Sequence, residues 1–184
     1  RSRDAQLGSL ALLRLPGMRR AVLSSGIMVT AIDLSVIYLP VLGAGRGLSA
    51  GTVSALLATR ALASTMSRFG YSRVIARLGR RRLLLMSSAL ASVSLLAVAL
   101  PLPTWAMIGV VAMMGLGLGL NMPLTMAWVT AVSPPGSRGH AIALRIGANR
   151  LGQVTFPTVL GVAAASFGAA AVFVAIGVAV GLTL

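Results

Sequence analysis

Six long apolar runs follow one another along the chain, separated by short stretches that contain glycine, proline or arginine. Each run approaches the ~20 residues that an α-helix needs to cross ~30 Å of hydrocarbon. The runs consist of continuous Ala, Leu, Val and Gly, not the alternating polarity of a membrane β-barrel. The pattern therefore predicts an all-α integral membrane fold with six transmembrane helices, at residues 21–42, 50–67, 83–101, 105–130, 141–165 and 169–184.

The polar stretches between the runs set the expected domain limits. Residues 1–18 are polar and then mixed, and we expect a cytoplasmic linker arm there, followed by a six-helix transmembrane domain at 19–184. The chain begins at Arg1 and not at methionine, and its last apolar run has no polar tail. We therefore expect the sequence to be a piece of a longer protein, with its last helix cut short.

Composition and charge strengthen the membrane assignment. The chain is 57% hydrophobic and only 10% charged, whereas a soluble domain is nearer ~25% charged. Its net charge is +14, and most of the arginines fall in three segments that six spans would bring to one side. Cytoplasmic segments carry the excess of basic residues in membrane proteins, which predicts cytoplasmic ends and argues against nucleic-acid binding. These arginines are Arg1, Arg3, Arg14, Arg19, Arg20, Arg68, Arg73, Arg77, Arg80, Arg81, Arg82 and Arg138.

Several kinds of chemistry have no candidate residues. The chain has no cysteine, which excludes a disulfide, a thiolate metal site and a thiol nucleophile. The polar segments contain no carboxylate pair, no nucleophile with a neighbouring base and no phosphate-binding loop. We therefore expect no enzyme activity, no metal and no cofactor. His140 lies at the start of a predicted helix, where a solvated position is favoured over a role in proton transfer.

Charged residues inside the apolar runs are the candidate functional groups. An ionisable group at bilayer depth costs at least ~2.5 kcal/mol, so it usually faces a cavity or a partner. The candidates for a substrate or proton pathway are Asp33, Arg60, Asn149, Arg150 and Gln153. Asn149 and Gln153 are four residues apart and therefore share one helix face. A third intramembrane arginine, Arg145, lies near enough to its helix start for the side chain to reach the interface by snorkelling.

The depth of these groups follows from the helical rise. Arg60 and Arg150 each lie about 16 Å from the start of their runs, near the midplane, and Asp33 lies within reach of a long arginine side chain. Asp33 and Arg60 could form an ion pair that locks two helices together, or they could handle substrate or protons. Both interpretations remain open at this point.

Small residues at helical spacing point to close helix contacts. Gly115 and Gly119 are four apart, and so are Gly177 and Gly181. This spacing lets two membrane helices approach closely, which explains these glycines better than a ligand does.

The connection after the second run reads SRVIARLGRRRLL, residues 72–84. It resembles the cytoplasmic signature of the major facilitator superfamily (MFS), Gly-x-x-x-Asp-Arg-x-Gly-Arg-Arg, and the matching residues are Arg77, Gly79, Arg80 and Arg81. Ser72 and Ala76 replace the family's glycine and aspartate, so a charge-pair latch is not expected here. The segments at 115–123 and 134–153, with Pro157, are similar to the fourth and fifth helices of the C-terminal half in bacterial members.

This resemblance implies a fold and a function. It implies half of a twelve-helix bundle, with the N-terminal six-helix half missing, that carries a small molecule across the plasma membrane by alternating access. Its partners would be membrane lipid, the small-molecule substrate and the missing half. Proton-coupled efflux of a drug-like or amphipathic compound, by an antiporter, is favoured over an uptake symporter. A non-transporting membrane scaffold or receptor is the other class of function that stays open.

Overall fold

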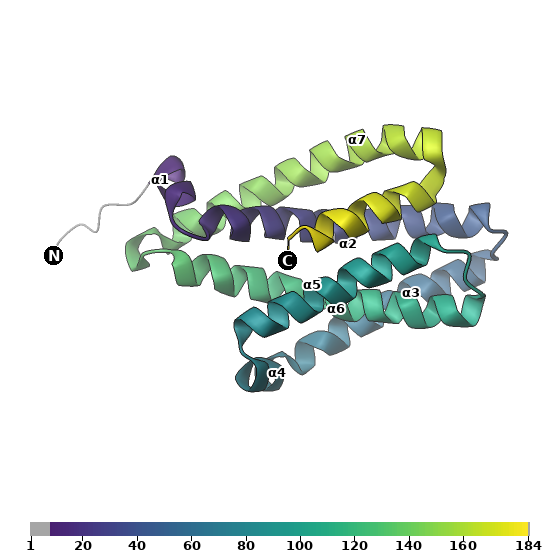
Figure 1. Cartoon of the computed structure of the whole chain (residues 1–184), viewed down its shortest axis with the longest axis horizontal. Helices are drawn as coiled ribbons and strands as arrows, with labels where there is room; N and C mark the ends of the chain where they lie inside the picture. Colours follow the sequence, from purple (N-terminus) through teal and green to yellow (C-terminus); the bar gives the residue numbers. More distant parts are fainter. Residues whose placement is uncertain (1–7, 184) are drawn as a thin grey trace.

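The computed structural model describes residues 8–183, and all regular secondary structure in this range is helical. Figure 1 shows the helices as an elongated bundle. The all-α fold predicted from hydropathy is confirmed. Residues 1–7 of the predicted linker arm, and Leu184, lie outside the described residues. The elements are α1 (Ser9–Arg14), α2 (Met18–Gly45), α3 (Ala50–Phe69), α4 (Tyr71–Leu78), α5 (Arg80–Ala99), α6 (Thr104–Val132), the 3-10 helix η1 (Pro135–Ser137) and α7 (Arg138–Gly181).

Four helical segments are both long and apolar enough to cross a membrane: Met18–Gly45, Arg80–Ala99, Thr104–Val132 and Ala164–Gly181. α3, and the first part of α7 at residues 138–167, are long enough by their rise per residue but less apolar. Arginine, serine and threonine side chains lower the hydropathy of these two segments. Each of the six predicted runs is helical in the structure, and four of the six have the composition of a membrane span.

A break at Gly168 divides α7 into two parts. Gly168 has φ 78° and ψ 170°, a conformation that residues with a side chain rarely adopt. The second part of α7, residues 169–181, turns back along the bundle from this point (Figure 1). The break lies where the sequence predicts the connection between the fifth and sixth runs.

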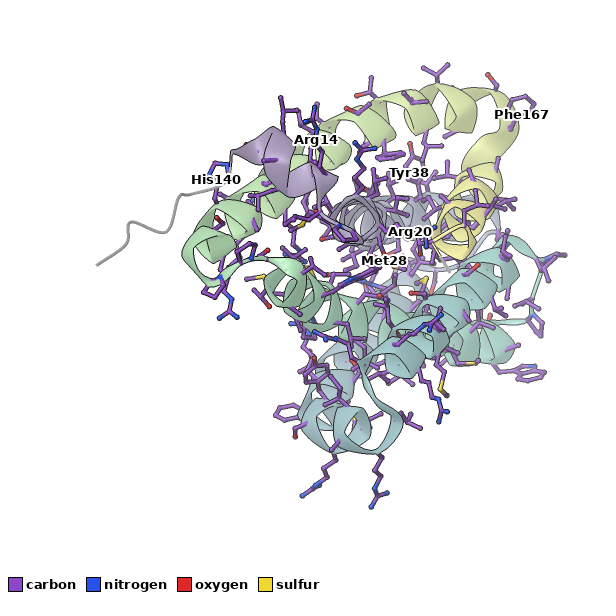
Figure 2. All side chains as sticks on the ribbon, turned by 60° about the vertical axis from the view of Figure 1, so that its left-hand side comes forward. Arg14, Arg20, Met28, Tyr38, His140 and Phe167 are labelled. Carbon is purple, nitrogen blue, oxygen red and sulfur yellow. The ribbon has the colours of Figure 1, made fainter. Side chains whose placement is uncertain are left out.

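Side chains at the two ends of the first part of α7 stay at the surface. His140 is exposed, and its Nε2 lies 2.9 Å from the Oγ of Ser9 on α1. Figure 2 shows His140 beside α1, and Phe167 at the opposite end of this segment. Phe167 is 78% exposed. These two residues therefore mark the two ends of this helical segment, one beside α1 and one at the break.

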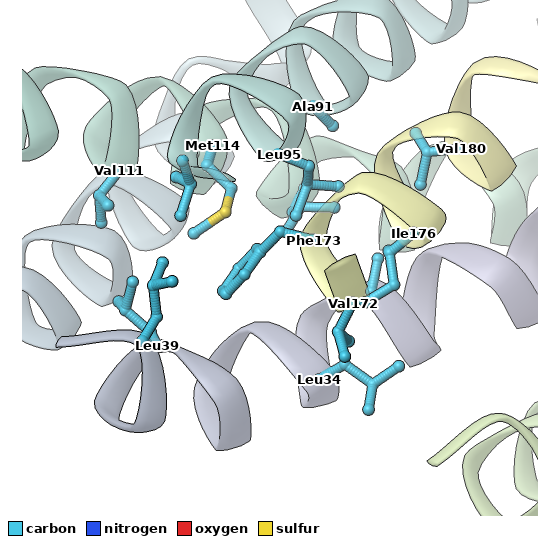
Figure 3. Packing of buried hydrophobic residues seen from close by; sticks show 14 of the residues in the cluster. Leu34, Leu39, Ala91, Leu95, Val111, Met114, Val172, Phe173, Ile176 and Val180 are labelled. Atoms are coloured by element: carbon cyan, nitrogen blue, oxygen red, sulfur yellow. The ribbon is translucent and has the colours of Figure 1, made fainter. Parts of the chain in front are cut away.

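The main core lies where α2, α5, α6 and the second part of α7 meet. Figure 3 shows Phe173 of α7 among Leu95 of α5, Met114 and Val111 of α6, and Leu39 of α2. All five of these side chains are fully buried. α3 contributes less to this core, because it packs mainly along α6.

A second, smaller core lies at the end of the bundle that carries α1. Leu12 of α1 is fully buried against Met18 and Val22 of α2, Val129 of α6 and Ala141 of α7. The sequence predicted a linker arm up to residue 18. Residues 9–14 of this segment form a helix that packs on the bundle through the buried side chain of Leu12.

Glycines on α6 let two neighbours approach closely. A Cβ on Gly115 would collide with the carbonyl oxygen of Arg60 on α3, and one on Gly119 would lie 2.6 Å from that of Ser64. Gly117, which the sequence reasoning did not single out, faces the other side, where an added Cβ would lie 2.7 Å from the backbone of α5. α6 is therefore held between α3 and α5 by glycines on two of its faces.

The other glycine pair lies where α7 meets α5. A Cβ on Gly177 would lie 2.9 Å from the side chain of Leu96, and one on Gly181 would lie 3.0 Å from Ser92 Oγ. The Ser92 hydroxyl also donates a hydrogen bond of 2.7 Å to the carbonyl of Gly177. Both glycine pairs thus lie at close helix contacts.

Candidate functional site

A chain of three polar side chains joins α2 to the first part of α7. Gln153 Nε2 donates to Asp33 Oδ2 at 2.6 Å, and Arg150 Nη1 donates to Gln153 Oε1 at 3.0 Å. The Gln153 amide uses its donor and its acceptor at the same time, one toward the carboxylate and one toward the guanidinium. Asp33 is therefore linked to Arg150 through a neutral amide.

The backbones of α2 and α7 come close enough to make these contacts because small residues face each other. A Cβ on Gly152 would lie 3.2 Å from Thr30 Oγ1, and one on Gly26 would lie 3.9 Å from the carbonyl of Ala148. Residues later in α2 contact residues later in α7, so the two helices run parallel. This register brings Asp33 alongside the turn that carries Gln153.

Asn149 makes a second contact between the same helices. Its side chain is buried, and its Oδ1 accepts a hydrogen bond of 3.0 Å from Ser25 Oγ. Asn149 and Gln153 both reach α2, as expected for residues four apart on one helix face. Thr30 lies between them in depth, and its Oγ1 is buried without a hydrogen-bond partner.

Arg60 lies apart from this chain, on α3. It is partly buried, and its Nε is fully buried without a hydrogen-bond partner. Among the described residues no ion pair joins it to Asp33, although the carboxylate is near enough to act on Arg60 by Coulombic attraction. The ion pair considered from the sequence is not formed, because Asp33 is held by Gln153 on the other side.

Arg145 lies where the sequence did not place it. Snorkelling to the interface was expected, but the residue is only 5% exposed, so that expectation is wrong. Its Nη2 donates to Thr125 Oγ1 at 3.0 Å, and its Nη1 and Nη2 lie 3.9 and 3.7 Å from the sulfur atoms of Met126 and Met122. The side chain turns toward α6 because a hydroxyl and two polarisable sulfur atoms are available there. The Nε of Arg145 has no partner.

Asn121 of α6 is a buried polar residue that sequence reasoning missed. Its Nδ2 donates to the carbonyl of Gly117 at 2.9 Å, and its Oδ1 accepts from Ser88 Oγ of α5 at 3.4 Å. Both side chains are buried, so this contact supports the packing of α5 on α6. The only signal in the sequence was an asparagine within an apolar run.

The arginine-rich loop is formed by α4 and the start of α5. Gly79 between them has φ 76°, which explains why this position of the loop is a glycine. All three arginines of this loop, Arg77, Arg80 and Arg81, are exposed, and Arg80 Nη1 donates to the carbonyl of Ala127 on α6 at 2.8 Å. One arginine of the predicted signature therefore fixes the loop to α6.

Arg46 has a comparable role at the opposite end of the bundle. Its Nη2 donates to the carbonyls of Val98 and Ala99, at 3.0 and 2.8 Å, at the end of α5. Burial lowers the pKa of this guanidinium below its usual value. Cations stabilise helix carboxyl ends because the last carbonyls have no partner within the helix.

A groove of about 980 Å³ lies at the end of the bundle near α1, away from the charged residues of the helix interiors. Its walls include Leu23 and Ile27 of α2 and Leu84 of α5, and Arg20 and Arg81 lie at its edge. In residues 8–183, no group of three or more His, Cys, Asp or Glu side chains comes together. The polar chemistry inside the bundle therefore depends on Asp33, the three arginines and the amides beside them.

Comparison with known proteins identifies the family of the chain. The family model of the Major Facilitator Superfamily matches residues 21–184. No curated protein matches the chain. The matched range begins near the start of α2 and includes every residue of the polar chain that joins α2 to α7.

Proposed function

Since the chain belongs to the Major Facilitator Superfamily, we propose that it forms the C-terminal six-helix half of a secondary transporter. In this proposal α3 and the first part of α7 also cross the membrane, and both ends of the segment are cytoplasmic. The substrate is a small molecule held near the bilayer midplane between this half and an N-terminal half. The membrane is the plasma membrane of a bacterium.

Asp33 is the proposed proton carrier, and its link to Gln153 is the observation that supports this role. Asp33 is the only acidic residue in the described chain, and it lies within a membrane helix. A carboxylate paired directly with arginine is held ionised. An amide can donate to the ionised carboxylate and can accept from the protonated acid, so the link to Gln153 is compatible with both states.

Export of a drug-like or amphipathic compound is the proposed direction and substrate class. The resemblance to bacterial members favours export over uptake, and α3 contains no Asn, Gln, Asp or Glu side chain that would bind a sugar. A proton-coupled exporter would exchange protons for substrate at Asp33. An uptake symporter would use the same carboxylate. The direction of substrate movement under a pH gradient therefore has to be measured to distinguish export from uptake.

The test uses the full-length protein in proteoliposomes. Asp33→Asn should leave substrate exchange intact and abolish accumulation driven by a pH gradient, because the amide cannot carry the proton. Arg68→Gln, on an exposed side chain at the end of α3, is the control and should behave as wild type. Wild-type accumulation by Asp33→Asn would remove Asp33 from the coupling mechanism, and the absence of any transport by wild type would favour a scaffold or receptor.

A further inference from the structure

The helix interiors contain more positive than negative charge. In residues 8–183, Arg60, Arg145 and Arg150 lie within helices of the bundle, against a single carboxylate, Asp33. A charged group in the membrane normally pairs with an opposite charge or faces a water-filled cavity. Two of the three arginines therefore need another source of negative charge or of hydrogen-bond acceptors.

The hydrogen bonds identify which arginine lacks a partner. Arg150 reaches Asp33 through Gln153, and Arg145 has the hydroxyl of Thr125 together with two methionine sulfur atoms. Arg60 has no hydrogen bond or ion pair among the described residues. The residue is partly buried, and its Nε is fully buried. Arg60 is therefore the one of these three arginines whose guanidinium has no hydrogen bond or ion pair among the described residues.

The position of Arg60 is fixed by its backbone. Its carbonyl lies against Gly115 of α6, so the start of its side chain cannot shift far. It lies about 15 Å from the start of α3, close to the midplane of a ~30 Å hydrocarbon layer. Leu56 and Ala63, one turn before and one turn after Arg60 on α3, are buried apolar residues. The combination is a fixed cation in an apolar setting at the depth where transporters hold their substrates.

We propose that Arg60 binds the anionic group of the transported substrate, which is an amphipathic organic anion such as a carboxylate or sulfonate. The inference rests on the proposed transport function and narrows its substrate class. The planar guanidinium donates two parallel hydrogen bonds to two oxygen atoms of such a group, which selects it over a neutral amide or a cation. Asp33, on the neighbouring α2, keeps a separate role because Gln153 holds it toward α7.

The test uses the full-length protein in proteoliposomes with two sets of matched probes. One set is naphthalene-1-sulfonate, 1-naphthamide and (1-naphthylmethyl)trimethylammonium, and the other is octanesulfonate, octanamide and octyltrimethylammonium. Movement driven by a pH gradient is measured for each, and binding to the purified protein is measured by the change in thermal unfolding. Wild type should move and bind the sulfonates in preference to their partners.

Variants of Arg60 then separate recognition from structure. Arg60→Gln should weaken binding of the sulfonates roughly tenfold or more, as expected for loss of charge-assisted hydrogen bonds, without changing unfolding of the ligand-free protein. Arg60→Lys, which keeps the charge, should retain part of the binding. Arg68→Gln is the matched control on the same helix and should bind as wild type, because its side chain is exposed near the end of α3.

Three other results would contradict the inference or the transport function on which it rests. Transport of the cations or amides without the sulfonates would overturn the anion specificity while leaving the transport function standing. Unfolding of the ligand-free protein by Arg60→Gln and also by Arg60→Lys would show that Arg60 pairs with a fixed carboxylate of the other half. Movement of none of the six probes, in a protein that also fails to exchange protons, would reject the transport function itself.

Discussion

Two pairs of helical segments in this bundle have opposite character. α5 and the end of α7 at Ala164–Gly181 are apolar enough to cross a membrane, and the four buried serines of α5 are turned into the bundle. α3 and the first part of α7 are less apolar and carry Arg60, Arg145 and Arg150. The first pair supplies buried side chains to the main apolar core, whereas the charged side chains of the second pair need polar partners at membrane depth.

The largest expected effect concerns the close contact that holds α3 against α6. Gly115→Ala should lower the free energy of unfolding by about 1–3 kcal/mol, because the new methyl group would collide with the backbone of α3. Gly109→Ala on the same helix is the control, since nothing lies within 4 Å of an added Cβ there. Unfolding measured in mixed micelles should separate the two variants, and equal stability would show that α3 is not held closely against α6.

An effect of similar size is expected at the contact between α6 and Arg145. Thr125→Val removes the only oxygen within residues 8–183 that accepts a hydrogen bond from this buried guanidinium, and should cost about 1–3 kcal/mol of stability. Combining it with Arg145→Met should cost less than the sum of the two single changes, because no unsatisfied charge remains. Purely additive losses would mean that Arg145 does not depend on Thr125.

The smallest expected effect is the coupling between Asp33 and Arg60. Because no ion pair joins them among the described residues, the coupling energy from Asp33→Asn and Arg60→Gln should stay below about 0.5 kcal/mol. A double-mutant cycle on unfolding provides the number. Rescue of the stability of Asp33→Asn by Arg60→Gln would restore the interpretation that these residues lock α2 to α3.

The helical segments were predictable from sequence because apolar runs and the residues that break them are local signals. The break at Gly168 and the turn at Gly79 belong to this class, and so does the shared face of Asn149 and Gln153. The partners of the charged residues were not predictable. Arg145 turns inward because Thr125 lies opposite it on α6, and that proximity is set by the packing of two distant segments.

The same reason explains the polar contacts that sequence reasoning missed. Gly117, Arg46 and Asn121 all act on α5 or its end, which comes close to each of them only in the folded bundle. From the sequence, only Arg60 was considered as a partner of Asp33, and Gln153 was not. The parallel register of α2 and α7 favours Gln153.

The measurement that tests the account most directly is whether α3 crosses the membrane. The chain has no cysteine, so single cysteines can be introduced at Gly45, before α3, and at Arg73, in α4 after it. In intact cells a membrane-impermeant maleimide should label the cysteine at position 45 from outside, and should reach position 73 only after the cells are opened. Labelling of both positions from the same side would contradict a spanning α3 and, with it, the placement of Arg60 at the substrate.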